Sequence, residues 1–402
     1  MSTVFHHLGV TPIINGKGPA TRLSGSLLRP EVAEAMVEAS RHCVDIAELQ
    51  AATGAYIAEV TGAESGYVSN GAASGLMLAA AACIAGHDLA AMNRLPDTTG
   101  LNNEIIVARS HRNMYDHAVR TAGATLVEIG VADRYAGAGV RDAEPWEYAA
   151  AITERTAAVY YVQAPGNRPS LPEVVAAMKP HDIPVIVDAA GQLPPMSNLK
   201  RFIAEGADLV CFSGGKAIAG PQASGIIAGR DDLIMSVAMQ HLDMDTAPSR
   251  WNPPTRLIDR DAIQGMPRDG IGRICKVGKE EIAGLVTALR LAIEDDASGA
   301  MRQSWSQRIT SLAEGLAGLN KAQITVRDDP ARDPVPMLAI DLDEAALERS
   351  AEAVLIELET GNPPVYFEPG EIEAGTLVVN PQCLRDEEVA TMAGRLRDVL
   401  RD

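Results

Sequence analysis

The stretch Leu209-Val210-Cys211-Phe212-Ser213-Gly214-Gly215-Lys216 decides the fold of this chain. Its first four residues are apolar, which is typical of a strand buried on both faces of a parallel sheet. The two glycines let the backbone turn sharply, so the amine of Lys216 is delivered at the end of that strand. A lysine in a buried pocket has a lowered pKa and readily forms a Schiff base. We therefore interpret Lys216 as a nucleophile at a sheet edge.

This stretch has two other interpretations. A nucleotide-binding P-loop needs a glycine five residues before Gly215 and Ser or Thr after the lysine. The chain has Val210 and Ala217 at these positions, so the P-loop fails on spacing. The second interpretation is a lysine in a surface loop, and this stretch alone does not exclude it. It is less favoured because two further features of the sequence have related chemistry.

The first of these features is the apolar run Pro184-Val185-Ile186-Val187, which ends in Asp188. A carboxylate at the end of a buried strand is costly unless a cation pairs with it. A protonated pyridine nitrogen would be such a partner. The alternative is a helix N-cap at the end of a βα unit, for which aspartate is equally suited.

The second feature is Val68-Ser69-Asn70-Gly71-Ala72-Ala73-Ser74, which leads into an alanine-rich helix. Small residues at a helix start leave backbone N–H groups uncovered, and these groups together with the helix dipole bind phosphate. The alternative is a glycine N-cap for a buried helix. All three features are predicted where parallel strands end, which is the edge that binds ligands in open α/β sheets.

Short β-branched runs alternate with helix-length stretches through the middle of the chain, which predicts βαβ units around a mostly parallel sheet. The predicted strands are 105–108, 126–129, 157–162, 185–187, 209–212 and 226–228, followed by 337–342 and 377–379. Helices are predicted from Pro30, over 46–60, from about residue 278 and over 389–400, with an irregular segment over 235–273. We divide the chain into an N-terminal segment 1–44 that acts as lid or dimer contact, a large domain 45–279 and a small α+β domain 280–402.

Composition limits the partners of this 402-residue chain. Its formal net charge is −18 and Lys and Arg form no cluster, which argues against nucleic acid and acidic membrane. The five cysteines are scattered singly and no His stands at ligand spacing, so neither disulfides nor a metal site is expected. The N-terminus has no leader pattern and no apolar run nears ~18 residues, so we expect a cytoplasmic protein.

The order of phosphate turn, strand-terminal Asp and Ser-Gly-Gly-Lys resembles the fold type I pyridoxal-phosphate enzymes, the aspartate-aminotransferase-like group. Further motifs resemble the branch of D-glucosaminate-6-phosphate ammonia-lyase and selenocysteine synthase, and the likeness extends to about residue 285. These motifs are Ile14-Asn15-Gly16, Thr21-Arg22-Leu23-Ser24-Gly25-Ser26, Asn70-Gly71-Ala72-Ala73, Ser110-His111-Arg112-Asn113, Gly270-Ile271-Gly272-Arg273 and Lys276-Val277-Gly278-Lys279-Glu280.

The resemblance implies a role for each matching residue. Lys216 would hold pyridoxal phosphate as a Schiff base and later move a proton, and Asp188 would face the pyridinium nitrogen. Gly71, Ala72 and Ser213 would surround the phosphate. His111 would stack on the pyridine ring, with a structural histidine at a strand exit as the alternative, and Gln163 would face the phenolic oxygen unless it only supports its loop.

The resemblance also implies a homodimer or larger homo-oligomer and a small amino acid or amino sugar acid as substrate. An arginine should meet the substrate carboxylate, because its planar fork pairs with two oxygens. Arg22 is the first candidate, followed by Arg273 and Arg385, and a solvated or interface charge is the alternative for each.

The ammonia-lyase resemblance implies Cα deprotonation and β-elimination of a hydroxyl group, giving a 2-keto acid and ammonia. A racemase or epimerase and an aminotransferase share the first step and stay open. A selenium transferase acting on tRNA is disfavoured by the net charge of −18. A non-catalytic binding protein is disfavoured because Asp188, Lys216 and the phosphate turn occur together.

Overall fold

The computed structural model describes residues 3–133, 139–140 and 142–401. The chain forms two compact units, one comprising Met1–Leu27 with Arg290–Asp402 and the other Leu28–Leu289. The predicted boundaries at residues 44 and 279 differ from this division. Helix α2 (Pro30–Ser40) belongs to the larger unit, and the second division falls inside the continuous helix α11 (Lys279–Ser298). A lid or dimer role for residues 1–44 stays a prediction.

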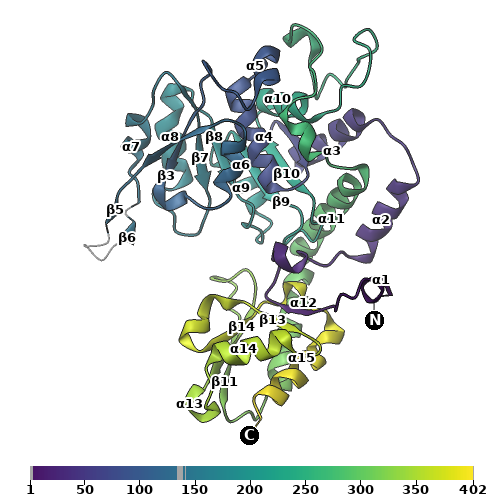
Figure 1. Cartoon of the computed structure of the whole chain (residues 1–402), viewed down its shortest axis with the longest axis vertical. Helices are drawn as coiled ribbons and strands as arrows, with labels where there is room; N and C mark the ends of the chain where they lie inside the picture. Colours follow the sequence, from purple (N-terminus) through teal and green to yellow (C-terminus); the bar gives the residue numbers. More distant parts are fainter. Residues whose placement is uncertain (1–2, 134–138, 141, 402) are drawn as a thin grey trace. The chain divides into compact units, whose positions relative to one another are not determined.

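The larger unit is built on a seven-stranded sheet in the order β2-β10-β9-β8-β7-β3-β4 (Figure 1). Strand β10 is antiparallel to both of its neighbours, and the pairs from β9 to β4 are parallel. The strands are β2 (Ser65–Ser69), β3 (Glu104–Ala108), β4 (Thr125–Ile129), β7 (Thr156–Val162), β8 (Val185–Asp188), β9 (Leu209–Ser213) and β10 (Gly225–Gly229). The mostly parallel sheet confirms the predicted fold class, and six of its strands were predicted.

Helices flank this sheet because its central strands are apolar on both faces. Residues Ile105 to Ala108 of β3 are all completely buried, although successive side chains point to opposite faces. Helix α4 (Ala72–Ala85) packs against β7 to β10 and against α6 and α10. The other helices are α3 (Ile46–Thr61), α5 (Leu89–Arg94), α6 (Asp116–Thr121), α7 (Pro145–Ala150), α8 (Leu171–Met178), α9 (Asn198–Ala204) and α10 (Asp231–His241); β5 (Ala132–Asp133) pairs with β6 (Gly139–Val140).

The segment predicted as irregular over 235–273 is partly helical, which corrects that prediction. Helix α10 continues through Met235 to His241, because its residues from Leu233 onward are buried and contact α4. Beyond His241 the chain is irregular up to α11, apart from short 3-10 turns at Arg260–Ala262 and Ile271–Cys275.

The smaller unit is α+β, as predicted. Its antiparallel sheet has the order β11-β12-β14, and β1 pairs in parallel with β13. Ile14 of β1 is buried in the same apolar cluster as C-terminal strands and helices, which explains why the N-terminal segment joins this unit. The elements are α1 (Thr3–His7), β1 (Ile14–Gly16), α12 (Ala300–Gly315), β11 (Ala322–Arg327), β12 (Met337–Leu342), α13 (Glu344–Leu347), α14 (Ala351–Thr360), β13 (Val365–Phe367), β14 (Thr376–Val379) and α15 (Asp386–Val399).

Candidate active site

Lys216 follows the carboxyl end of β9 and is half-buried. Glycines precede it because the turn leaves no room for side chains: a Cβ on Gly214 would stand 2.2 Å from the Ser224 hydroxyl oxygen, and one on Gly215 would stand 2.6 Å from the Cα of Gln222. Burial lowers the pKa of the Lys216 amine, and the negative charge of Asp188 opposes that shift. The amine is therefore neutral, and nucleophilic, at a lower pH than an exposed lysine.

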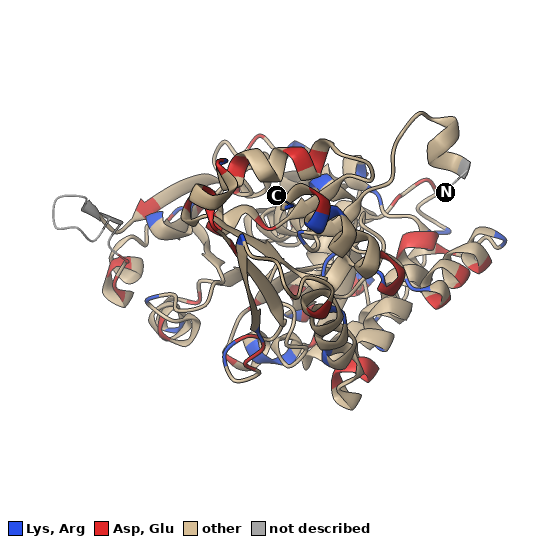
Figure 2. Cartoon of the chain, turned by 90° about the horizontal axis from the view of Figure 1, so that it is seen from below, with Lys and Arg blue, Asp and Glu red and all other residues tan. Residues whose placement is uncertain are grey.

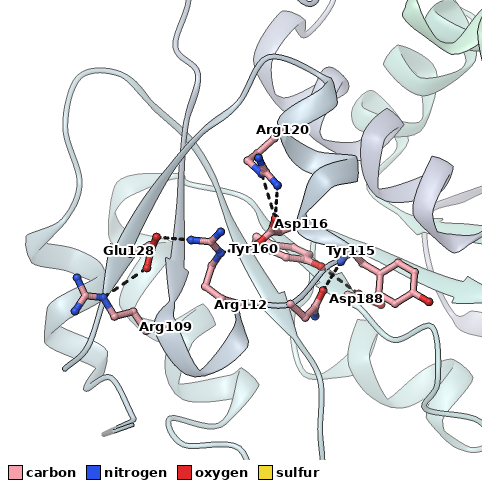
Figure 3. A network of polar contacts seen from close by, with 9 residues as sticks. Arg109, Arg112, Tyr115, Asp116, Arg120, Glu128, Tyr160 and Asp188 are labelled. Carbon is pink, nitrogen blue, oxygen red and sulfur yellow. Dashed lines mark hydrogen bonds and ion pairs between the residues drawn. The ribbon is translucent and has the colours of Figure 1, made fainter. Parts of the chain in front are cut away.

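Asp188 ends β8, the strand beside β9, and is buried. One carboxylate oxygen accepts a hydrogen bond from the Tyr160 hydroxyl at 3.1 Å (Figure 3). The other accepts one from the Ala190 N–H at 3.0 Å. Burial raises the pKa of Asp188, while these two hydrogen bonds and the charge of Lys216 oppose the shift. A further cation near this carboxylate would favour its ionised form.

The turn after β2 packs tightly against the start of β10. A Cβ on Gly225 would stand 2.6 Å from the carbonyl carbon of Gly71 and 2.8 Å from the backbone nitrogen of Ala72. Gly225 pairs in register with Ser213, so the three predicted phosphate-binding residues lie around one point of the sheet edge. Gly71 adopts a φ of +143°, which favours glycine, and the hydroxyls of Ser69 and Ser74 both donate to its carbonyl oxygen.

Helix α4 begins immediately after Gly71, and its first N–H groups have no partners within the helix. The space that a Cβ on Gly71 would enter holds no heavy atom within 4 Å. A helix N-terminus with open space before it suits a phosphate group. This geometry fits the phosphate of pyridoxal phosphate, and the Asp188 carboxylate fits its ring nitrogen.

His111 ends the 3-10 turn that follows β3, and it is 5% exposed. Its ring meets that of Tyr161 edge to face, with centroids 4.6 Å apart. The Nε2 atom lies 3.2 Å from the Asn167 amide nitrogen, whereas Nδ1 is buried without a hydrogen-bond partner in the described part of the chain. Burial lowers the pKa of His111 to about 4, and the charge of Asp142 opposes this shift.

Ion pairs hold the segment on both sides of His111 (Figure 3). Arg112 pairs with Asp116 at the start of α6 and with Glu128 on β4, and Arg109 also reaches Glu128. Asp116 is almost fully buried and has a second partner in Arg120, at 3.1 Å. The network therefore fixes the turn that carries His111 to two neighbouring elements.

Gln163 directly follows β7, and its backbone N–H donates to the Asp188 carbonyl oxygen at 2.9 Å. Its side-chain amide donates to the Ala164 carbonyl oxygen. The structure therefore places Gln163 beside Asp188 and gives its amide nitrogen a partner within its own loop. Contact with a cofactor stays a prediction for this residue.

The three predicted carboxylate-binding arginines have different surroundings. Arg273 belongs to the larger unit, donates to the His241 carbonyl oxygen and pairs with Asp243 at 3.1 Å. Arg22 and Arg385 belong to the smaller unit. The Arg22 guanidinium lies over the Tyr366 ring, and Arg385 pairs with Glu387 and Glu388 at the start of α15. A role in substrate binding stays a prediction for all three.

Two side chains near these residues were missed from the sequence. Tyr160 holds Asp188, and Asn167 contacts both His111 and the Val162 carbonyl oxygen. Both belong to the β7 region, which pairs with β8. The order of strands in the sheet decides which residues far apart in the sequence become neighbours, and the sequence does not show that order. The sequence signal that could have pointed to Tyr160 and Asn167 is that polar residues stand near the end of an apolar strand.

Charged residues of both signs are distributed over the molecule, and Figure 2 shows Lys and Arg interspersed with Asp and Glu. Among the described residues, no helix is long and apolar enough to cross a membrane. The same part of the chain contains no group of three or more His, Cys, Asp or Glu side chains that could hold a metal ion.

The fold and the site at the sheet edge define a fold type I, aspartate-aminotransferase-like protein that depends on pyridoxal phosphate. The same fold occurs in a solved alanine–glyoxylate aminotransferase of a Nostoc species, with a TM-score of 0.55 at 16% identity. Residues 20–245 match the family model of L-seryl-tRNA selenium transferase (SelA), and the chain belongs to this family.

Its relatives differ in the activities their names describe. The chain is 32% identical to a 5'-C-glycyluridine monooxygenase-decarboxylase of a Streptomyces species, over 99% of this chain and 92% of that protein. It is 28% identical to the D-glucosaminate-6-phosphate ammonia lyase of Salmonella typhimurium, over 98% and 97%. A solved structure of D-glucosaminate-6-phosphate ammonia-lyase superposes with a TM-score of 0.82 at 27% identity and covers 100% of this chain and 99% of that one. The suspected branch is confirmed, and the reaction is left open.

Proposed function

We propose that this protein is an ammonia-lyase that converts a hydroxylated amino acid or amino sugar acid into a 2-keto acid. The observation that carries the proposal is that Lys216 follows β9 and the buried Asp188 ends the neighbouring parallel strand β8, so that the amine and the carboxylate lie at the same edge of the sheet and influence each other electrostatically. The likeness to the Salmonella lyase over nearly the whole of both chains supports it.

Lys216 would hold the cofactor covalently through Nζ, Asp188 would face its ring nitrogen, and Gly71, Ala72 and Ser213 would surround its phosphate. His111 and Gln163 would contact its ring and phenolic oxygen. When bound, pyridoxal phosphate withdraws electrons from the substrate Cα and so makes its proton removable.

Two residues of the chain carry the proposed proton chemistry. The Lys216 amine takes the Cα proton, because burial lowers its pKa and leaves a neutral amine available. Asp188, anchored by Tyr160 and Ala190, stays ionised when a cation pairs with it. Elimination of the β-hydroxyl releases water, and hydrolysis consumes one water, so the net products are a 2-keto acid and ammonia.

A second candidate is an oxidative decarboxylation, favoured by the 32% identity to the Streptomyces monooxygenase-decarboxylase. Applied to an amino acid, such a reaction would use one O2 and give an amide, CO2 and water. Racemisation, epimerisation and transamination begin with the same removal of the Cα proton. Selenium transfer and a purely binding role are less favoured.

The proposed partners are a small substrate and further copies of this chain, as a homodimer or larger assembly in the cytoplasm. One of Arg22, Arg273 and Arg385 would bind the substrate carboxylate. Arg273 would have to exchange its contact with Asp243 for the substrate, so we expect its replacement to raise KM more than it lowers kcat.

The decisive test compares Lys216→Ala with the matched control Lys200→Ala, which alters an exposed lysine of the same unit. We expect the wild type and the control to show the visible absorption of a Schiff base and Lys216→Ala to lose it, with activity lower by about 10²–10⁴-fold. A wild type without that absorption after incubation with pyridoxal phosphate contradicts the proposal.

The reaction is identified with a panel of D- and L-hydroxy amino acids and amino sugar acids. Ammonia together with keto acid, without O2 uptake, supports the lyase. O2 uptake with CO2 release indicates the oxidative decarboxylation. Deuterium exchange at Cα without ammonia indicates a racemase or epimerase, and a requirement for an added keto acid indicates an aminotransferase.

A further inference from the structure

We propose that Asn167 fixes His111 as the neutral tautomer that carries its proton on Nδ1, so that His111 acts as a hydrogen-bond donor to a bound ligand and not as a base. The assignment of the tautomer follows from contacts within the larger unit. The role toward a ligand rests on the proposed function.

The first step is the orientation of the Asn167 amide. Its nitrogen lies 2.6 Å from the Val162 carbonyl oxygen. A carbonyl oxygen only accepts hydrogen bonds, and an amide oxygen in that position would repel it. The NH2 group of Asn167 therefore faces Val162, and a flipped amide is excluded by this contact.

The second step carries this orientation to the imidazole. The same amide nitrogen lies 3.2 Å from His111 Nε2 and has a second hydrogen to donate. Nε2 must then be the acceptor, which means that it carries no proton. In a neutral imidazole the proton consequently resides on Nδ1.

The third step concerns this Nδ1–H group. It is buried, and no acceptor for it occurs in the part of the chain that the structure describes. A buried donor without an acceptor is unfavourable, so a bound molecule with an oxygen acceptor there would relieve the cost. A carboxylate, hydroxyl or phenolic oxygen would suit this donor.

Other charged and titratable groups also surround His111. Asp142 acts on it electrostatically, and the Tyr161 ring packs against it. Arg109 and Arg112 are its neighbours in the chain, and both pair with Glu128. The Tyr161 hydroxyl donates to the Pro169 carbonyl oxygen and also contacts the Asn167 side chain. Because the NH2 group of Asn167 still faces His111 Nε2, Asn167 is the residue that we expect to select the tautomer.

His241 provides an internal comparison. It is also buried, but its Nε2 lies 3.0 Å from the Cys275 carbonyl oxygen and must donate, whereas Nδ1 lies 2.9 Å from the Tyr67 hydroxyl and accepts. The two histidines should therefore have opposite tautomers in one protein.

The test uses ¹⁵N-histidine-labelled full-length protein, with and without cofactor, and two-bond ¹H–¹⁵N correlation spectra of the rings. We expect His111, assigned with His111→Gln, to be protonated on Nδ1 from about pH 5 to 8 and His241 on Nε2. Asn167→Ala should give a mixture of His111 tautomers. Asn167→Asp should move the proton to Nε2 and raise the pKa of His111, with no change at His241.

Tyr67→Phe is the matched control, which should perturb His241 and leave His111 unchanged. An Nε2-protonated or doubly protonated His111 in the wild type at neutral pH would overturn the proposal, as would an unchanged His111 spectrum in Asn167→Ala. Unchanged His241 signals report that the Asn167 variants have folded, and unchanged His111 signals report the same for Tyr67→Phe. The cofactor-free spectra require no reaction. The tautomer assignment can therefore hold even if the lyase assays fail, and the two failures can be told apart.

Discussion

Asp188 and Asp208 lie at opposite ends of two neighbouring parallel strands. Asp188 ends β8, at the carboxyl edge of the sheet, and Asp208 directly precedes β9, at the amino edge. Asp208 accepts from the Val185 N–H and pairs with Arg230, which also pairs with Asp232. Asp188 is held by the neutral groups of Tyr160 and Ala190, with Lys216 as its electrostatic partner. One edge pairs its carboxylate with arginine, and the other leaves the carboxylate available to a ligand.

This difference separates structural charges from functional ones. Burial raises the pKa of both carboxyl groups, so desolvation by itself does not distinguish the two edges. The partner does, because an arginine completes the ion pair within the protein. At the carboxyl edge the ion pair would be completed by a bound cation, and under the proposed function the ring nitrogen of pyridoxal phosphate would supply it.

The largest expected effect comes from replacing each of the two aspartates, in separate variants, with asparagine. Asp188→Asn should lower kcat by about 10²–10³-fold, because it removes the charge that stabilises the protonated ring. It should leave the free energy of unfolding of the cofactor-free protein nearly unchanged, since a costly buried charge is lost. Asp208→Asn should retain activity and lower that free energy by about 1 kcal/mol. Steady-state kinetics and urea unfolding measure both, and equal losses of activity would contradict the contrast.

The two ends of β10 allow the same comparison with glycines. A Cβ on Gly225 would press on Gly71 and Ala72, and a Cβ on Gly229 would stand 2.0 Å from the Asp208 carbonyl oxygen. Both Gly→Ala changes should lower the free energy of unfolding by about 1–3 kcal/mol. Gly225→Ala should in addition weaken binding of pyridoxal phosphate in fluorescence titrations, whereas unchanged binding there would remove the phosphate turn from the proposed site.

Tyr160→Phe is expected to have a smaller effect. It deletes one hydrogen bond to Asp188, so the pKa of the carboxyl group rises further and the ionised form is weakened by about 1 kcal/mol. We expect a severalfold lower kcat and weaker cofactor binding. The matched control is Tyr161→Phe, which removes a hydroxyl that donates to the Pro169 carbonyl oxygen. This variant should leave cofactor binding unaltered.

The smallest effect is a shift along the pH axis. The lowered pKa of Lys216 means that cofactor capture by the cofactor-free protein should speed up as the pH rises, with a midpoint below the ordinary lysine value of about 10.4. The charge of Asp188 raises that pKa, so Asp188→Asn should move the midpoint to lower pH and Asp208→Asn should not. Stopped-flow absorbance measures it, and an upward shift would reverse the assigned sign.

Much of this site was predictable from the sequence because its parts are local. Gly214, Gly215 and Lys216 follow an apolar strand directly, Asp188 ends another, and Gly71 precedes an alanine-rich helix. Strand ends and helix starts are recognised from periodicity and turn residues, and parallel strands place their carboxyl ends at one edge. The fold class followed from the same alternation of strands and helices.

Tertiary structure alone decided which side chains meet. Tyr160 reaches Asp188 because β7 pairs with β8, and Asn167 reaches His111 across 56 residues of chain. Ile14 joins the C-terminal unit through β13, and the helix through His241 is stabilised by contacts with α4. The sequence determined the chemistry available at the sheet edge, since that depends on residue types beside local backbone breaks. Strand order and packing determined which partners tune that chemistry, because such contacts depend on residues that are distant along the chain.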